Sequence, residues 1–154
     1  MEFLHQQCQL TLREGLEELY RHNPEVASVS KTKGKTFTDH DLTHIIFGCD
    51  TSITGEILLK PWILFGTDIS MREVREYAAD PEVQQLNQEG AALLGGKFVA
   101  SLKILFYYVP QFFWIWLNHL RKMRKKWPHS TLTEEMLDTK ICDLRAEYKI
   151  SVLG

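Results

Sequence analysis

Apolar residues recur every three or four positions along much of the chain, which is the spacing of one face of an α-helix. In residues 3–22 these positions are Leu4, Cys8, Leu12, Leu16 and Leu19. Residues 137–148 repeat the spacing after a capping sequence that starts at Thr131. No segment signals a β-strand, and a length of 154 residues suits one domain. We therefore predict an all-α, single-domain helical bundle over residues 1–154.

Turn and cap residues divide the middle of the chain into short helices. Asn23-Pro24 ends the first helix, and the polar residues 28–35 are predicted to form a loop. Pro61 predicts a kink or a restart, because proline lacks an amide donor and crowds the carbonyl four residues earlier. Residues 70–73 form a capping box for one short helix, and Asp80-Pro81 begins another.

The most apolar stretch, residues 98–120, is long enough to cross a bilayer, which takes about 20 residues. Lys103 and Pro110 interrupt it, so we expect two helices broken at Pro110 rather than a membrane span. Its aromatic side chains would either form core or line an apolar cavity that suits a long isoprenoid tail. Five of the six residues from Arg121 to Lys126 are basic, which indicates either a solvated helix end or contact with an anionic lipid surface.

Two histidines and an aspartate share a helix predicted for residues 39–47. His40 and His44 lie one turn apart on one face, and Asp41 lies beside them. Two neutral imidazoles with carboxylate oxygens suit zinc, iron, manganese or cobalt, and leave coordination positions for water or substrate. A simpler interpretation makes Thr38 the N-cap and Asp41 a carboxylate that stabilises the helix start, with solvated histidines. Spacing alone leaves both interpretations open.

Glu56 can join this group from the next helix. Gly48 is a natural stop for the histidine helix, and Asp50, Thr51 or Ser52 can cap a second one. Glu56 then falls about one turn into that second helix. A helix-turn-helix of this length can fold the glutamate onto the histidines. The spacing therefore predicts a helix-turn-helix metal site, with apolar residues just after Glu56 forming a wall near it.

The motif His40-Asp41-x-x-His44, followed after eleven residues by Glu56, resembles the signature of the ubiquinone (coenzyme Q) biosynthesis family of the Coq-four type. The similarity extends to Ile45-Ile46-Phe47-Gly48, to the glycine at Gly55 and to the segment from Leu144 to Ile150. The resemblance implies four metal ligands: His40, Asp41, His44 and Glu56.

The resemblance also implies a function. Members of this family act on or present polyprenylated benzoquinone precursors, look like catalysts of oxidative decarboxylation at ring carbon one, and associate with other enzymes of the pathway. The implied cofactor is a divalent metal ion, with zinc expected and iron, manganese or cobalt as alternatives. The implied partners are a polyprenylated quinone precursor or other isoprenoid lipid, the other ubiquinone-biosynthesis enzymes and a membrane surface. No catalytic residue is assigned beyond the ligands.

Two alternatives belong to other functional classes. One is a non-catalytic isoprenoid lipid-binding or scaffold protein, in which the metal only joins two helices. The other is a metal-dependent hydrolase of the histidine-aspartate phosphohydrolase kind, which needs a further histidine and aspartate at the ion. The distant candidates for those two ligands are His119, His129, Asp138 and Asp143.

Composition and charge narrow the picture by exclusion. With 44% hydrophobic and 25% charged residues, the composition is typical of a soluble globular domain. The net charge of -2 gives no overall positive potential that would attract nucleic acid. Cys8, Cys49 and Cys142 have no paired spacing, so neither a disulfide framework nor a Cys-x-x-Cys metal site is expected. Residues 1–7 show no basic leader and no apolar run, so neither a secretory signal nor a transit peptide is expected, and we predict a cytoplasmic protein of bacterial type. The family resemblance implies that it is peripheral to the inner membrane.

Overall fold

A computed structural model of the chain describes residues 1–153, apart from the side chains of Glu82 and Leu86. The α-helices are α1 (Leu12–His22), α2 (Pro24–Lys33), α3 (Lys35–Phe47), α4 (Ile53–Pro61), α5 (Met71–Ala79), α6 (Pro81–Leu93), α7 (Lys97–Lys103), α8 (Val109–Asn118), α9 (Glu134–Leu137) and α10 (Ile141–Tyr148). Short 3-10 helices are η1 (Glu2–Leu4) and η4 (Leu120–Lys122), and π-helical turns are η2 (Trp62–Gly66) and η3 (Ile104–Tyr108). These described residues contain two isolated β-bridges and no β-strand. The all-α, single-domain prediction is confirmed.

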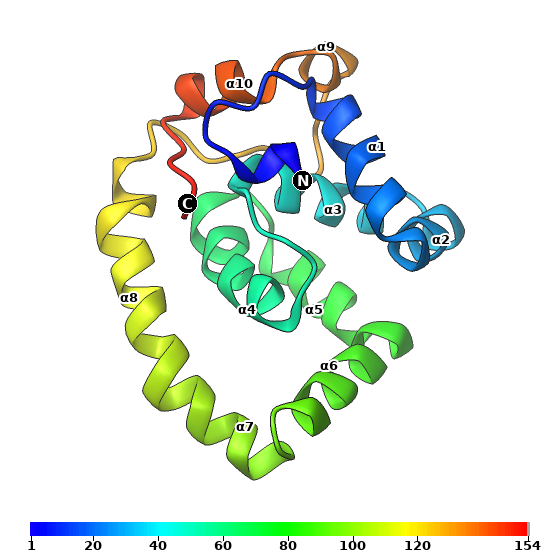
Figure 1. The fold of residues 1–154 in the computed structure, drawn as a ribbon, viewed down its shortest axis with the longest axis vertical. Coiled ribbons are helices and arrows are strands. Elements are labelled where there is room, and N and C mark those ends of the chain that lie inside the picture. The colour runs from blue at the N-terminus through cyan, green and yellow to red at the C-terminus, as the bar shows by residue number, and fades with distance from the viewer. Residues whose placement is uncertain (154) are drawn as a thin grey trace.

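Helix α3 lies at the centre of the helical body. It contacts α1, α2, α4 and α10, and α8 packs on α4. Figure 1 shows the chain from α5 to α8 leaving this body and returning to it as a V, with the turn between α6 and α7 at the end away from both termini. That turn contains Gly95 and Gly96. The histidine helix is therefore held inside the body, while α6 and α7 extend from it.

The second half of α3 forms the core. Ile45, Ile46 and Phe47 are fully buried, and Leu42 is nearly so. Phe47 stacks on Trp62, with the two ring centroids 4.8 Å apart. Because this turn is buried on all sides, α3 has no solvent-facing side at its C-terminal end.

One charged side chain is fully buried in this core. Arg145 of α10 donates hydrogen bonds to the backbone oxygens of Ile46, Ile45, His5 and Phe3, at 2.9, 2.7, 2.7 and 2.6 Å. Two of these carbonyls end α3, where a positive charge complements the helix dipole. Burial lowers the pKa of Arg145 to about 10, so the guanidinium is charged at neutral pH. Arg145 therefore joins α3, α10 and the N-terminal segment.

The first helix is shorter than predicted. It begins at Leu12 rather than at residue 3, because Thr11 and Glu14 form a capping box there. Ahead of it, the backbone runs beside α10, and the amide of Cys142 donates to the oxygen of Cys8 at 3.1 Å. Cys8 is buried by this tertiary packing without being helical. The apolar spacing therefore predicted correctly that Cys8 is buried, but it was wrong in predicting that Cys8 lies in a helix.

Residues 28–35 are mostly helical, so the predicted loop is wrong. α2 begins with Pro24 in its first turn and continues through most of this range. The polar side chains are compatible with a helix because most of them lie outside, whereas Ser30 is buried. α3 then begins at Lys35, and Thr38 lies inside that helix rather than capping it.

The apolar stretch of residues 98–120 does not break at Pro110, contrary to the prediction. α7, η3 and α8 follow one another without a loop, and η3 is a π-helical turn just before the proline. The wider turn accommodates a residue that has no amide donor and would crowd the carbonyl of Phe106. Pro61 is the last residue of α4, and a π-helical turn follows it directly, so the predicted restart with Pro61 in the first turn of a helix does not occur and the predicted kink stays a prediction.

The predicted C-terminal helix is divided in two. α9 ends at Leu137 and α10 begins later, because the amide of Leu12 donates to the oxygen of Thr139 at 3.0 Å and holds the intervening segment against α1. The two helices predicted in the middle of the chain are confirmed. α5 follows a capping box at Ser70, and α6 starts at Pro81.

Candidate metal centre

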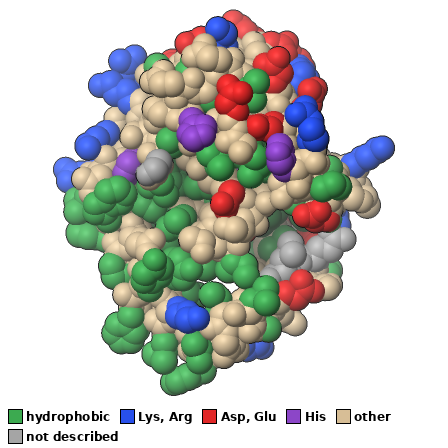
Figure 2. All heavy atoms as spheres, viewed as in Figure 1, with side chains coloured by type: hydrophobic (Ala, Val, Ile, Leu, Met, Phe, Trp, Pro, Cys, Tyr) green, Lys and Arg blue, Asp and Glu red, His purple; other side chains and the backbone are tan. Residues whose placement is uncertain are grey.

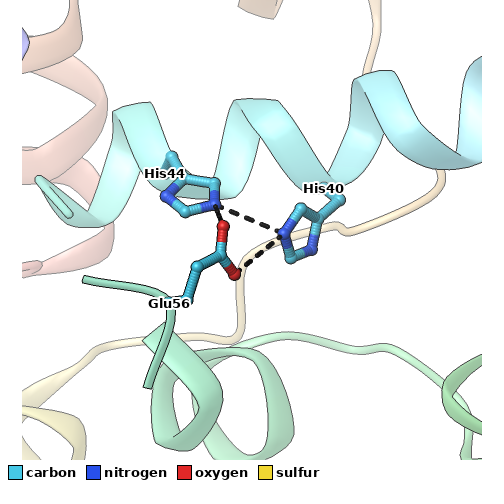
Figure 3. A group of neighbouring side chains, drawn as sticks. All are labelled: His40, His44 and Glu56. Carbon is cyan, nitrogen blue, oxygen red and sulfur yellow. Dashed lines mark hydrogen bonds and ion pairs between the residues drawn. The ribbon is translucent and has the colours of Figure 1, made fainter. Parts of the chain in front are cut away.

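Helix α3 and the start of α4 bring together two imidazoles and a carboxylate. His40 and His44 lie one turn apart on α3, and Glu56 lies in the first turn of α4 (Figure 3). Between them Gly48 adopts a left-handed conformation with φ of 66°, which a residue without a side chain reaches easily. Ser52 then caps α4 by accepting a hydrogen bond from a backbone amide of its first turn. The predicted helix stop and the predicted cap are both confirmed.

The ligand atoms of these side chains lie at separations that suit a metal ion. Nε2 of His44 is 3.3 Å from Nε2 of His40 and 3.1 Å from Oε1 of Glu56, and Nε2 of His40 is 3.7 Å from Oε2 of Glu56. One ligand atom from each residue falls within 4.8 Å of the others. Ligands at about 2.0–2.1 Å from a tetrahedral ion lie roughly 3.3 Å apart. The group could therefore hold a metal ion with small side-chain movements.

The backbone determines which nitrogen of His44 faces the group. Its Nδ1 lies 3.2 Å from the carbonyl oxygen of Cys49 and 3.1 Å from that of Asp50. A carbonyl oxygen can only accept, so Nδ1 carries the hydrogen and donates it, and the lone pair of the neutral ring is on Nε2. The side chain is 1% exposed, which leaves it no room to turn. Backbone partners of this kind orient metal-binding histidines.

Electrostatics within the group favour an ionised glutamate. Burial opposes a charged His44, but the hydrogen bond to Glu56 and its negative charge outweigh burial and raise the pKa of His44. Burial likewise opposes a charged Glu56, yet hydrogen bonds from His40 and His44 hold the pKa of Glu56 well below its usual range. A divalent cation competes with the proton that Glu56 favours on His44, so metal binding weakens as the pH falls.

The fourth expected ligand, Asp41, points toward other partners. Its Oδ2 accepts hydrogen bonds from the hydroxyl of Tyr20, at 2.9 Å, and from the hydroxyl of Ser30. Burial raises the pKa of Asp41, although both hydroxyls oppose the rise. Because Tyr20 belongs to α1 and Ser30 to α2, Asp41 holds both helices against α3. The converging group found in the described residues does not include it, and its role as a ligand stays a prediction.

One aromatic residue that the sequence did not indicate contacts the group. Tyr77 of α5 stacks on His40, with ring centroids 4.9 Å apart and an interplanar angle of 23°. It also packs against Phe37, at 5.3 Å between centroids. Burial, followed by the negative charge of Glu56, raises the pKa of Tyr77, so the phenol keeps its proton. The capping box at Ser70 predicts α5 but carries no signal of where that helix packs.

We expect Tyr77→Ala to weaken metal binding about tenfold, the low end of what residues supporting a ligand contribute. Tyr77→Phe should leave the affinity nearly unchanged, because the ring rather than the hydroxyl holds His40 in place. Competition with a chromogenic chelator measures both affinities. Wild-type affinity in Tyr77→Ala would show that the stacking does not position His40.

Gly55→Ala should disturb the centre through the backbone. A Cβ at this position would overlap the carbonyl oxygen and the carboxylate of Asp50, and that carbonyl accepts the hydrogen bond from His44. Relief of the overlap moves the loop, so we expect metal affinity to fall about tenfold and stability to fall by about 1–3 kcal/mol. Gly90→Ala is the control, because a Cβ there meets nothing within 4 Å. Full metal affinity in Gly55→Ala would mean that this loop does not orient the histidine.

The distant candidates for hydrolase ligands do not join the group. Nδ1 of His119 lies 2.8 Å from the carbonyl oxygen of Ser151, and Asp138 forms an ion pair at the surface. Within residues 1–153, as far as their side chains are described, neither of these nor His129 or Asp143 joins the converging ligand atoms. The aromatic side chains of residues 98–116 are mostly exposed, so an enclosed apolar cavity beside the group stays an expectation.

Comparisons with known proteins do not identify the chain. Models of known protein families, curated proteins and solved structures yield no match. The resemblance of the motif between His40 and Glu56 to the ubiquinone-biosynthesis family therefore stays an expectation drawn from the sequence.

Proposed function

We propose that this chain binds a divalent metal ion, zinc in the first place, through His40, His44 and Glu56 and acts in ubiquinone biosynthesis. The observation that carries the proposal is the convergence of two imidazole nitrogens and one carboxylate within 4.8 Å. The assignment to ubiquinone biosynthesis rests on the family resemblance around this motif. The substrate is then a polyprenylated benzoquinone precursor, and the other enzymes of the pathway are partners.

The donor set suits such an ion. Imidazole nitrogen and carboxylate oxygen together favour zinc and also accept iron, manganese or cobalt. Three protein ligands leave at least one coordination position free, and 43% of the Glu56 side chain is exposed, so the group is accessible from outside. When bound, the ion supplies Lewis-acid chemistry to a carboxylate or phenol oxygen of the substrate.

The residues around the ligands keep them in position. The carbonyls of Cys49 and Asp50 hold Nε2 of His44 toward the group, and Tyr77 packs on His40. In the proposed reaction, oxidative decarboxylation at ring carbon one, the carboxylate leaves as carbon dioxide, water supplies the new hydroxyl group, and O2 takes up two electrons and two protons to leave as hydrogen peroxide. Preorganised ligands serve this purpose because the protein need not rearrange during the reaction.

A non-catalytic role is the second candidate. Among the described residues, the converging group has no carboxylate or imidazole left over to act as a general base once its three members bind an ion. The ion would then join α3 to α4, and the chain would bind an isoprenoid lipid or present the precursor to another enzyme.

Two measurements on the purified protein test these proposals. Elemental analysis should find about one divalent ion per chain in the wild type and much less in Glu56→Gln, because the amide is a poorer ligand than the carboxylate. Incubation of the metal-loaded protein with a prenylated 4-hydroxybenzoate and oxygen should release carbon dioxide. Metal without carbon dioxide release would favour the scaffold. Equal metal in both proteins would overturn the site.

A further inference from the structure

Helices α7 and α8 expose a large amount of apolar side chain. The helix over Lys97–Lys122 is long and apolar enough to cross a membrane by length and composition. Only 17% of its most apolar 18-residue window is buried inside the protein. Its most exposed apolar residues, here termed the α7–α8 surface, are Phe98, Leu105, Phe106, Tyr107, Phe113 and Trp114. Figure 2 shows apolar side chains gathered over the left and lower parts of the molecule, where Figure 1 places α8 and α7. Contiguous apolar patches of this kind mark binding surfaces.

The helix body covers one side of this segment. Ile115 and Leu120 are buried, and α8 contacts α4. Phe113 and Trp116 lie on other sides of α8 and are exposed, at 61% and 40%. In α7 the buried residue is Ala100. No described part of the chain covers the outer side of α8 or most of α7, so this surface calls for an external partner.

The charged residues of the segment that carries the surface are all basic, although one of them, Lys125, pairs with Glu147 of α10 at 2.6 Å. Residues 90–133 contain seven Lys and Arg and no Asp or Glu, although the whole chain has a net charge of -2. Five of the seven lie in Arg121–Lys126, directly after α8. Aromatic residues beside a basic cluster are typical of segments that bind anionic lipid surfaces.

The same charges argue against a second copy of this chain as the partner. Parallel contact between two α7–α8 surfaces would bring the Arg121–Lys126 clusters of both copies together, and antiparallel contact would offer each cluster no acidic residue from 90–133. Juxtaposed like charges oppose association. An anionic bilayer satisfies both the apolar and the basic part of the surface.

The path of the chain favours a helix that lies in the membrane surface over one that crosses it. Tyr77 holds α5 against α3, and α6 leads from α5 to the turn before α7. A crossing by α7 and α8 would force α6 to cross back. The polar residues of α6 that would then enter the hydrocarbon include Gln84, Gln85, Asn87, Gln88 and Glu89. Such side chains are costly there without partners.

We propose that the α7–α8 surface docks this protein on an anionic lipid bilayer. The aromatic side chains enter the boundary between headgroups and acyl chains, Arg121–Lys126 lie among the headgroups, and the helix axis runs along the membrane plane. This inference goes beyond the proposed function and needs no metal ion. It also places α4, which carries Glu56 and packs on α8, near the phase in which a prenylated precursor dissolves.

Co-sedimentation with vesicles tests the docking. The wild type should bind vesicles of equal parts phosphatidylcholine and phosphatidylglycerol at least about tenfold more tightly than vesicles of phosphatidylcholine alone. The double variant Phe106→Ser, Phe113→Ser should bind the mixed vesicles about tenfold more weakly or worse. Met71→Ser is the matched control, because Met71 is 61% exposed but lies on α5, outside the surface.

Charge reversal tests the basic cluster separately. Lys122→Glu with Lys126→Glu should weaken binding to the mixed vesicles about tenfold or more at low salt, and less at high salt because of screening. Lys31→Glu with Arg75→Glu changes the charge equally on α2 and α5 and should have little effect. Circular dichroism of each variant shows that it is folded.

Tryptophan emission reports how the surface meets the lipid. Trp114 and Trp116 are exposed whereas Trp62 and Trp127 are fully buried, so a blue shift on adding vesicles originates in α8. Alkaline carbonate should release the bound protein, and its retention would overturn the interfacial placement in favour of a span. No binding of folded wild type to mixed vesicles would overturn the docking. A lipid-free dimer that Phe106→Ser, Phe113→Ser dissociates would assign the surface to a second copy instead.

Discussion

Zinc should raise the melting temperature of the wild-type protein by about 5–10 °C at roughly a hundredfold excess over its dissociation constant, and should not change that of His44→Ala. A ligand that binds only the native state raises the free energy of unfolding by about 2.7 kcal/mol at this excess. His44 is the residue to remove because its Nε2 lies 3.3 Å from His40 and 3.1 Å from Glu56, between the other two ligands. Thermal unfolding of chelator-treated and zinc-loaded protein measures the shift.

His119→Ala is the matched control for this experiment. His119 is also a buried histidine, 9% exposed, and it lies outside the converging group with its Nδ1 on the carbonyl oxygen of Ser151. The variant should lose stability for lack of that contact and still show the full zinc shift. If His44→Ala shifts as much as the wild type, zinc binds elsewhere and the metal centre is refuted.

Arg145→Met should lower the free energy of unfolding by about 3–5 kcal/mol, the largest loss we expect from one substitution. The methionine fills most of the volume but leaves the carbonyls of Phe3, His5, Ile45 and Ile46 without their donor. Each buried carbonyl without a partner costs about 1–3 kcal/mol, and these losses overlap. Chemical denaturation followed by circular dichroism measures the change.

Two further variants show whether the hydrogen bonds cause this loss. Arg145→Lys keeps the charge, but one ammonium group cannot reach all four oxygens, so we expect an intermediate loss. Arg13→Met removes an arginine that pairs with Glu134 and Asp138 at the surface, where its side chain is 44% exposed, and should cost less than about 1 kcal/mol. Equal stability of Arg145→Met and Arg13→Met would contradict the structural role of the buried guanidinium.

The convergence of three of the four expected ligands was accessible to sequence reasoning because the contacts are local. Side chains four residues apart share a face of any α-helix, which fixes His40 relative to His44. Gly48 and Ser52 stop and start helices through their own backbone and hydroxyl. The short connection then limits where Glu56 can lie.

The contacts of Asp41 and Tyr77 lie outside the reach of this reasoning. A residue next to His40 is rotated from it by about 100° around the helix, so Asp41 faces another side of α3. On that side Tyr20 and Ser30 supply hydroxyls from two other helices, and no local pattern encodes their arrival. Tyr77 reaches His40 from α5, whose own capping box predicts its start and not its packing.

The sequence by itself, through contacts between residues close together in the chain, determined that the protein is helical and that the histidine pair is followed by a turn. It also shows directly that the charge between residues 90 and 133 is all positive. The assembly of the helices determined the burial of Arg145, the contacts of Asp41 and the exposure of α7 and α8. The spacing of apolar residues identifies the apolar face of a helix. Whether that face is buried in the core depends on which other helix packs against it. In residues 98–116 the body covers one side, and the remaining aromatic side chains face outward.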